Sequence, residues 1–302
     1  SATKPAESGF ISLGWKPDKV ENPTGPGKLL PYVWVDSGDE HRLVTFLGAC
    51  AENPDYRVDP AMYYKLRRQL GTFGDTGPMV WFPWSGALFT NFFAHCWLNY
   101  AAMGADNPAA FGATHRARVD WWENARRAVR LHQLKARTNP DWLATHGQHG
   151  WGLSASDTPE GYGVPGVFPD RLAMPDARPE FDYSTFNVKD DFGGGTLAPY
   201  ASGCSILFDP LSALAAMKHN QSLKKPDGTP LVWRAPDAQS RGYGFQDAFN
   251  LGKNWVGTDC VAIDQGPLLL CIENARSGMI WDLFHRHASV KAGLERLKLN
   301  IR

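Results

Sequence analysis

Acidic side chains are the first candidates for chemistry in this sequence, because hydrolysis by proton transfer needs one protonated carboxyl group and a second carboxylate. Asp264 precedes an expected helix that begins near Pro267, and a helix N-terminus favours the charged form that a base needs. A structural cap is an equal alternative. Glu40 ends the segment Ser-Gly-Asp-Glu, which fits a capping box in which the glutamate only bonds back to the helix start.

Aromatic residues accompany two further acids, Asp247 and Asp157. Either acid could bind sugar hydroxyls, support its loop or serve as the base, and we assign Asp247 to catalysis and Asp157 to substrate binding. The chain has 12 Trp, 9 Tyr and 16 Phe, and aromatic faces pack against the C–H faces of sugars. The alternative for any single ring is a place in the core, and a satisfied core histidine is the usual state of His95. The candidates for substrate contact are Asp157, Trp34, His95, Trp97, Trp151, Tyr162 and Gln265.

Helices must hold these side chains. The spacing of apolar residues predicts helices over 40–51, 60–70, 85–103, 119–138, 210–220, 244–249, 267–277 and 280–297. No alternation of strands and helices is evident, so we expect a mainly α fold. Residues 139–203 are rich in Gly, Pro, Asp and Ser, and they are too long for a simple connection, which indicates functional loops.

The whole chain of 302 residues can form one large domain. Gly and Pro interrupt residues 1–36, which we predict to be an extended leader, and residues 37–302 form the expected catalytic domain. The 31 basic residues equal the 31 acidic residues, so neither nucleic acid nor an anionic membrane is an expected partner. The substrate is therefore expected to be neutral.

Several classes of site and of membrane segment are not expected. No apolar stretch approaches 18 residues, so we expect no membrane insertion, and a leader removed from the start would not be visible. Five cysteines lack zinc spacing and CxxC pairs, so we expect free buried thiols and no metal. The glycines at 193–195 precede no Lys-Ser/Thr, so we expect no nucleotide cofactor.

Long segments of the chain resemble the glycoamylase-like family, which includes bacterial β-1,2-glucanases and a domain of cyclic β-1,2-glucan synthases. The segments are FTNFFAHCWLNY (89–100), VDWWENARRAV (119–129), WGLSASDTPEGYG (151–163), GGGTLAPYASGCSILFDPLSALAAMKHN (193–220), YGFQDAFN (243–250) and WVGTDCVAIDQGPLLLCIENARSGMIWDLF (255–284). With GWKP (14–17), the resemblance covers about 14–297. The chain departs from the family pattern at Asp39, Asn91 and Asn99, which leaves the exact substrate open.

The resemblance implies an (α/α) barrel of six helical hairpins, with Glu40 as the general acid. The family's N-terminal helices have no counterpart here, so we expect the C-terminal two thirds of the fold, incomplete at its N-terminus. A partner chain or a missing N-terminal segment would then complete the barrel. A periplasmic or secreted location is expected.

Three functions remain open. The chain is expected to hydrolyse a β-linked glucan, most plausibly β-1,2-glucan, with Glu40, Asp264 and Asp247 as catalytic residues and with no cofactor. A transglycosylase would differ only in passing the sugar to another sugar rather than to water. A catalytically silent glucan-binding module is the third function, and the expected absence of N-terminal helices favours it.

Overall fold

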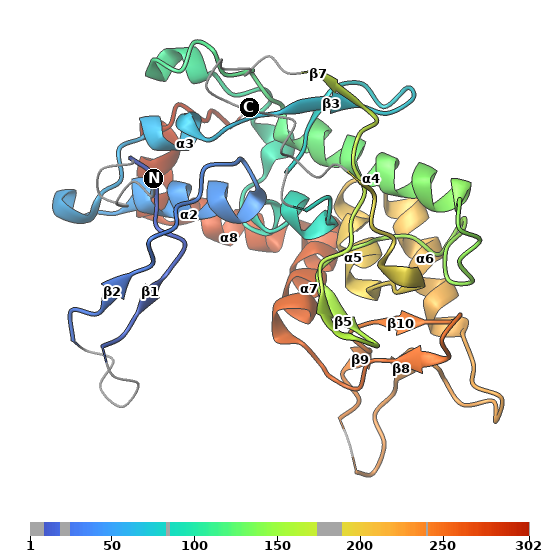
Figure 1. Cartoon of the computed structure of the whole chain (residues 1–302). Helices are drawn as coiled ribbons and strands as arrows, with labels where there is room; N and C mark the ends of the chain where they lie inside the picture. The colour runs from blue at the N-terminus through green and yellow to red at the C-terminus, as the bar shows by residue number, and fades with distance from the viewer. Residues whose placement is uncertain (1–8, 19–24, 83–84, 174–188, 240, 302) are drawn as a thin grey trace.

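Helices dominate the computed structural model, which describes residues 9–18, 25–82, 85–173, 189–239 and 241–301 (Figure 1). The α-helices are α2 (Asp39–Cys50), α3 (Ala61–Lys65), α4 (Trp121–Thr138), α5 (Pro199–Cys204), α6 (Pro210–Ser222), α7 (Ala262–Ser277), α8 (Met279–Arg286) and α9 (Ala288–Arg296). Short 3-10 turns connect them: η1 (Pro54–Tyr56), η2 (Leu88–Asn91), η3 (Ala94–Cys96), η4 (Tyr100–Ala102), η5 (Pro108–Phe111), η7 (Gly193–Gly195) and η8 (Ser205–Leu207). The mainly α class is confirmed, and the six-hairpin barrel stays a prediction.

The strands are two or three residues long, and all their pairings are antiparallel. One sheet has the order β4-β3-β7, and the others are the pairs β1-β2, β5-β6, β8-β9 and β10-β11. The bounds are β1 (Trp15–Lys16), β2 (Lys28–Leu29), β3 (Leu70–Thr72), β4 (Met79–Val80), β5 (Ser156–Thr158), β6 (Gly161–Gly163), β7 (Arg171–Ala173), β8 (Trp233–Arg234), β9 (Gly244–Phe245), β10 (Phe249–Asn250) and β11 (Trp255–Val256). Figure 1 shows β5, β9 and β10 gathered near one end of α7.

The predicted helix over 85–103 is wrong. Three 3-10 turns, η2, η3 and η4, occupy this stretch. Its backbone donors bind partners far away in the chain: Leu88 N donates to Leu153 O at 2.9 Å, and Ala94 N donates to a carboxylate oxygen of Asp39 at 2.9 Å. A continuous α-helix would need these N–H groups for its own carbonyls, so tertiary bonding replaces it.

Other helix predictions also need correction. The helix over 60–70 ends at Lys65 and is followed by β3, and 244–249 forms parts of β9 and β10. The helix over 280–297 divides at His287, which has an extended backbone and accepts the Ser289 amide at 3.3 Å as the cap of α9. Helix α7 begins at Ala262, ahead of Pro267, whose ring removes one N–H from the helix.

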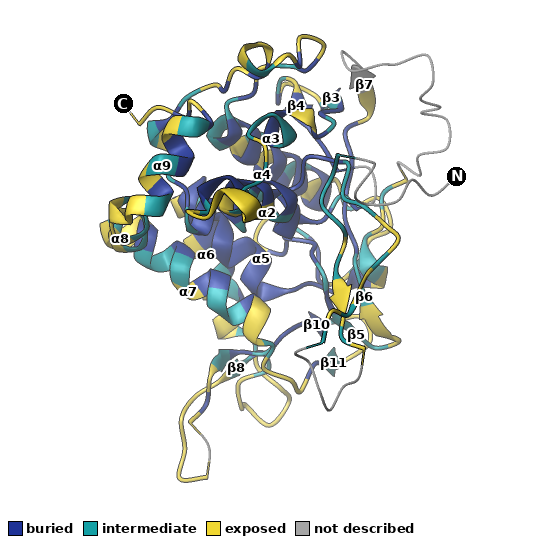
Figure 2. Cartoon of the chain, turned by 90° about the vertical axis from the view of Figure 1, so that its left-hand side faces the viewer, coloured by how far each residue is buried: buried dark blue, intermediate teal, exposed yellow. Residues whose placement is uncertain are grey.

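The core lies between α4, α5, α6 and α7, and a second apolar cluster joins α2 to α9. All six residues of α5 are buried, and Figure 2 shows this helix in dark blue at the centre. Four cysteines are buried free thiols, and Cys260 is an exposed one. Among the described helices, none has the length and hydropathy of a membrane span.

Residues 9–18 and 25–36 form an exposed β1-β2 hairpin and a return segment that reaches α2. The Trp34 ring lies 3.6 Å from the His41 ring, measured between centroids. The division into a leader and a domain of 37–302 stays a prediction.

We predict that Gly86→Ala destabilises the protein. A β-carbon on Gly86 would lie 2.2 Å from Val167 O, and backbone atoms on both sides of this contact would have to move apart. Overpacking of this kind costs about 1–3 kcal/mol. Gly147→Ala is the matched control, because its β-carbon would meet no atom within 4 Å. Urea unfolding measures both, and equal free energies of unfolding would contradict the prediction.

Candidate active site

Four acidic side chains that are distant in the sequence line one cavity of about 290 Å³. Glu40 comes from α2, Asp157 from β5, Asp264 from α7, and Asp247 from the segment between β9 and β10. The remaining lining residues are Phe89, Phe93, Ala155, Ser156, Tyr162, Tyr200, Val261 and Ile263. Four carboxyl groups that are distant in the sequence therefore share one cavity.

Glu40 does not form the capping box that its sequence allows. The N-cap of α2 is Gly38, which offers no side chain to bond, and Ser37 Oγ has no hydrogen-bond partner among the described residues. The Glu40 side chain instead borders the cavity, and burial raises its pKa. A carboxyl group that holds its proton more tightly in a cavity is suited to proton donation.

Asp264 and Asp247 form a buried pair on another wall. Burial first, and then the neighbouring Asp247 carboxylate, raises the pKa of Asp264 to about 8. Burial therefore outweighs the helix N-terminus, which favours the charged form. The backbone N–H of Asp157 donates to Asp247 Oδ2 at 2.7 Å, whereas Asp247 Oδ1 is buried with no hydrogen-bond partner in the described part of the chain. At neutral pH, Asp264 consequently keeps its proton.

The β5-β6 hairpin brings Asp157 and Tyr162 to the rim of the cavity. Asp157 pairs with Tyr162 in the strand register, and Tyr162 is 75% exposed. Burial, and then Asp264 and Glu40, raise the pKa of Tyr162. The Tyr162 ring thus stands near both the Glu40 wall and the Asp264 wall, where it can contact a bound sugar.

The other predicted substrate contacts, all of them described, do not line this cavity. His95 is 1% exposed and bonds to Asp39, so the core alternative holds for it. Trp97 packs on Phe284, and Trp151 is buried in the core. Gln265 donates to Phe245 O at 3.1 Å and borders a separate apolar groove. Trp34, as described above, lies against His41.

Sequence reasoning missed seven residues that line the cavity, and two of them, Ala155 and Ser156, directly precede Asp157. Phe89 and Phe93 stand in the segment that was predicted to be a helix, and Tyr200 is only 1% exposed. The Tyr200 hydroxyl donates to Ala155 O at 2.7 Å. The remaining two are Val261 and Ile263 at the start of α7. The aromatic composition of FTNFFAHCWLNY (89–100) was the available signal, because aromatic faces pack against sugars.

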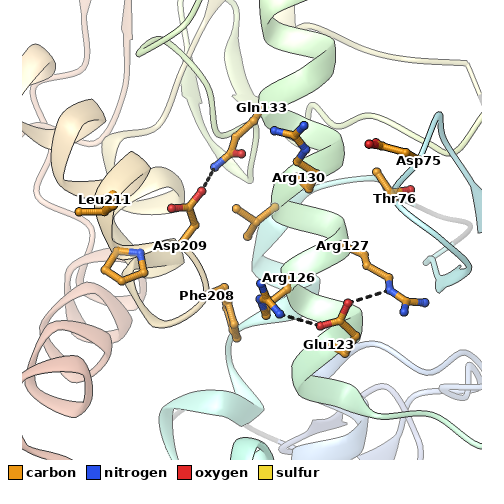
Figure 3. A pocket seen from close by; sticks show the side chains of 12 residues that line it. Asp75, Thr76, Glu123, Arg126, Arg127, Arg130, Gln133, Phe208, Asp209 and Leu211 are labelled. Atoms are coloured by element: carbon orange, nitrogen blue, oxygen red, sulfur yellow. Dashed lines mark hydrogen bonds and ion pairs between the residues drawn. The ribbon is translucent and has the colours of Figure 1, made fainter.

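A larger cavity of about 570 Å³ lies beside the polar side chains of α4 (Figure 3). Figure 3 shows that its charged side chains pair within the cavity: Glu123 binds Arg126 and Arg127, and Gln133 binds Asp209. Three arginines therefore face three acids, which leaves little net charge: Arg126, Arg127, Arg130, Asp75, Glu123 and Asp209. In this larger cavity Glu123 and Asp209 are bonded to arginine or glutamine side chains and not to another acid. We therefore place the candidate site in the smaller cavity.

The fold and the site define a mainly helical protein with an acidic cavity bordered by aromatic rings. The chain belongs to the Glycoamylase family ("Putative glucoamylase"), whose model matches residues 32–288. This agreement confirms the family resemblance drawn from the sequence segments.

Relatives share the fold over nearly the whole chain. The chain is 23% identical to an exo β-1,2-glucooligosaccharide sophorohydrolase (non-reducing end) of Parabacteroides distasonis, over 97% of this chain and 36% of that protein. An endo-β-1,2-glucanase of Chitinophaga pinensis, solved with sophorotriose and glucose, matches with a TM-score of 0.66, 22% identity, and coverage of 97% of this chain and 60% of that one. A β-1,2-glucanase structure from Parabacteroides distasonis matches with a TM-score of 0.67, 20% identity, and coverage of 96% and 37%. The chain thus spans between about a third and three fifths of the length of these relatives.

We predict that Asp264→Asn makes stability less dependent on pH. The pKa of Asp264 is about 8 in the folded protein and about 3.9 in an unfolded chain. Between these values the folded state keeps a proton that the unfolded state has lost, so the stability contributed by this group declines as pH rises to about 8 and is constant above it. Asparagine does not titrate, so that part of the decline disappears.

Urea unfolding at several pH values between about 4 and 9 measures this effect. Asp282→Asn is the control, because Asp282 is an exposed acid on α8 whose side chain is 68% exposed. The control should keep the slope of the unchanged protein. Parallel stability curves for Asp264→Asn and the unchanged protein would refute the shifted pKa.

Proposed function

We propose that this chain is a glycoside hydrolase that cleaves β-1,2-glucan. The observation that carries the proposal is one cavity lined by Glu40, whose pKa is raised by burial, and by the neighbouring carboxyl groups of Asp247 and Asp264. Glycosidic hydrolysis requires a proton-donating carboxyl group and a second carboxyl group in one site. The relatives that cleave β-1,2-glucans and their oligosaccharides support the substrate.

In this mechanism, Glu40 donates its proton to the glycosidic oxygen while the bond between that oxygen and the anomeric carbon breaks. Water forms the new bond to the anomeric carbon and passes a proton to a carboxylate oxygen of the Asp247–Asp264 pair. Solvent returns a proton to Glu40, and the pair releases one.

Substrate binding combines aromatic faces with hydrogen-bonding groups. Phe89 and Phe93 line the cavity, and the exposed Tyr162 stands at its rim. Asp157 offers carboxylate oxygens to sugar hydroxyls, while its backbone N–H is already committed to Asp247. A neutral glucan suits a chain whose basic and acidic residues are equal in number.

Product analysis on linear β-1,2-, β-1,3-, β-1,4- and α-linked glucans tests the substrate. We expect new reducing ends from β-1,2-glucan and little from the others. Transfer products longer than the starting chain would instead identify the transglycosylase. Binding of β-1,2-glucan without any new reducing end would identify the silent binding module and overturn the proposed hydrolysis.

We predict that Glu40→Gln lowers kcat by roughly 10²–10⁴-fold, the usual loss for a general acid, while the fold is retained. The amide keeps the shape of the side chain and removes only its proton. Steady-state hydrolysis and thermal unfolding are measured together, with Glu295→Gln on the exposed side of α9 as the control. Retained activity with a lower melting temperature would show that Glu40 serves the helix and not the reaction.

We predict that chelation by EDTA leaves hydrolysis unchanged. Among the described residues, no group of three or more His, Cys, Asp and Glu side chains is arranged to hold a metal ion. The carboxyl groups of the cavity therefore act by proton transfer in the proposed mechanism. A rate that falls with EDTA and returns with one divalent ion would contradict this prediction.

A further inference from the structure

Asp39 places a buried charge directly beside the proposed proton donor. Its side chain is 0% exposed at the first position of α2, while Glu40, the next residue, borders the cavity. Adjacent helical residues point about 100° apart, since a turn takes about 3.6 residues. The two acids therefore leave α2 in different directions, Asp39 into the core and Glu40 into the cavity.

Both carboxylate oxygens of Asp39 have fixed partners. Oδ2 accepts the Ala94 amide at 2.9 Å and lies 2.8 Å from His95 Nδ1, and Oδ1 accepts from Arg42 Nη2. The Arg42 guanidinium carbon lies 3.5 Å from the centre of the Trp121 ring at the start of α4. A buried carboxylate keeps its charge only with such partners, so the first turn of α2 is bound to η3 and α4.

The same turn η3 is also bound to the helix that carries the carboxyl pair. Asn274 on α7 donates its side-chain amide to Cys96 O at 2.9 Å. Asp264 stands near the start of this α7 helix. Glu40 and Asp264 are thus carried by two helices whose side chains bond to one three-residue turn, and this turn determines the spacing between the two helices.

We propose that Asp39 is a positioning residue that holds the Glu40 carboxyl group at its place opposite the Asp247–Asp264 pair by binding α2 to η3. The inference rests on the proposed function, in which Glu40 is the proton donor. Asp39 does not line the cavity, so it acts on the reaction only through Glu40. A misplacement of about 1 Å at a reacting group can cost on the order of 10²-fold in rate.

Kinetics of two substitutions test the proposal. Asp39→Ala should lower kcat on linear β-1,2-glucan by about 10- to 100-fold while KM stays within about twofold. Asp39→Asn should recover part of the loss, because its amide oxygen still accepts the Ala94 N–H. Assays use temperatures at which each variant is folded. A rise in KM with unchanged kcat would overturn the proposal.

A double-mutant cycle separates positioning from general destabilisation. In a Glu40→Gln background, Asp39→Asn should cause no further loss of kcat, because no proton donor remains to be misplaced. If the two losses multiply instead, Asp39 acts independently of Glu40 and the proposal is wrong.

Asp106 provides a matched buried ion pair. Its carboxylate binds Arg68 through two contacts of 2.8 Å and also accepts from Trp121 Nε1 at 2.9 Å, yet it does not border the cavity. Asp106→Asn should lower the melting temperature as Asp39→Asn does, while kcat of the folded protein stays within about twofold. An equal fall in kcat for both variants would attribute the effect to lost stability alone.

Crystal structures distinguish failure of the inference from failure of the proposed function. If the unchanged protein cleaves none of the glucans, the proposed function fails. The position of the Glu40 carboxyl group can still be compared between crystals of the unchanged protein and of Asp39→Asn. We expect the Glu40 carboxyl group to be displaced relative to Asp264 in the variant. An unmoved carboxyl group would overturn the positioning role, whatever the activity.

Discussion

The buried carboxylate of Asp39 is the interaction on which the centre of the molecule depends. A charge that is 0% exposed has no water to solvate it, so the chain must supply the donors, and it does so from η3 and from Arg42. Because Ala94 gives its amide to Asp39, the surrounding segment cannot use that amide for an α-helix. This bond therefore contributes both to the irregular backbone around Ala94 and to the placement of α2.

Burial has opposite consequences for the carboxyl groups of Asp39 and Asp264. Asp39 has a cation beside it, since Arg42 lies against its oxygen, and this pairing favours the charged form. Asp264 has no such cation, and burial, followed by the neighbouring Asp247, raises its pKa to about 8. Burial alone raises the pKa of Glu40. A cation beside the buried acid therefore separates the structural Asp39 from the two acids that hold their protons more tightly.

Sequence patterns predicted the elements whose partners are local and failed where partners are distant. The helix α4 follows its apolar spacing, and its N-cap Asp120 accepts the Glu123 amide at 3.0 Å within the same turn. The run around Phe92 has the same kind of spacing, but tertiary donors and acceptors decide its backbone. Likewise, the capping box at Glu40 was locally plausible, and the packing of α2 overrode it. No spacing in the sequence predicts that the four acids line one cavity, because they are far apart along the chain.

The long connection after α4 has a physical role that its composition only suggested. Its β5-β6 hairpin places the Asp157 backbone N–H on Asp247 Oδ2 at 2.7 Å, and it places the Tyr162 ring at the rim of the cavity. The same hairpin therefore supplies a hydrogen bond to one member of the acid pair and an aromatic ring to the mouth of the cavity. A displacement of this hairpin would move the Tyr162 ring and break the bond to Asp247 together, because both belong to one two-stranded turn.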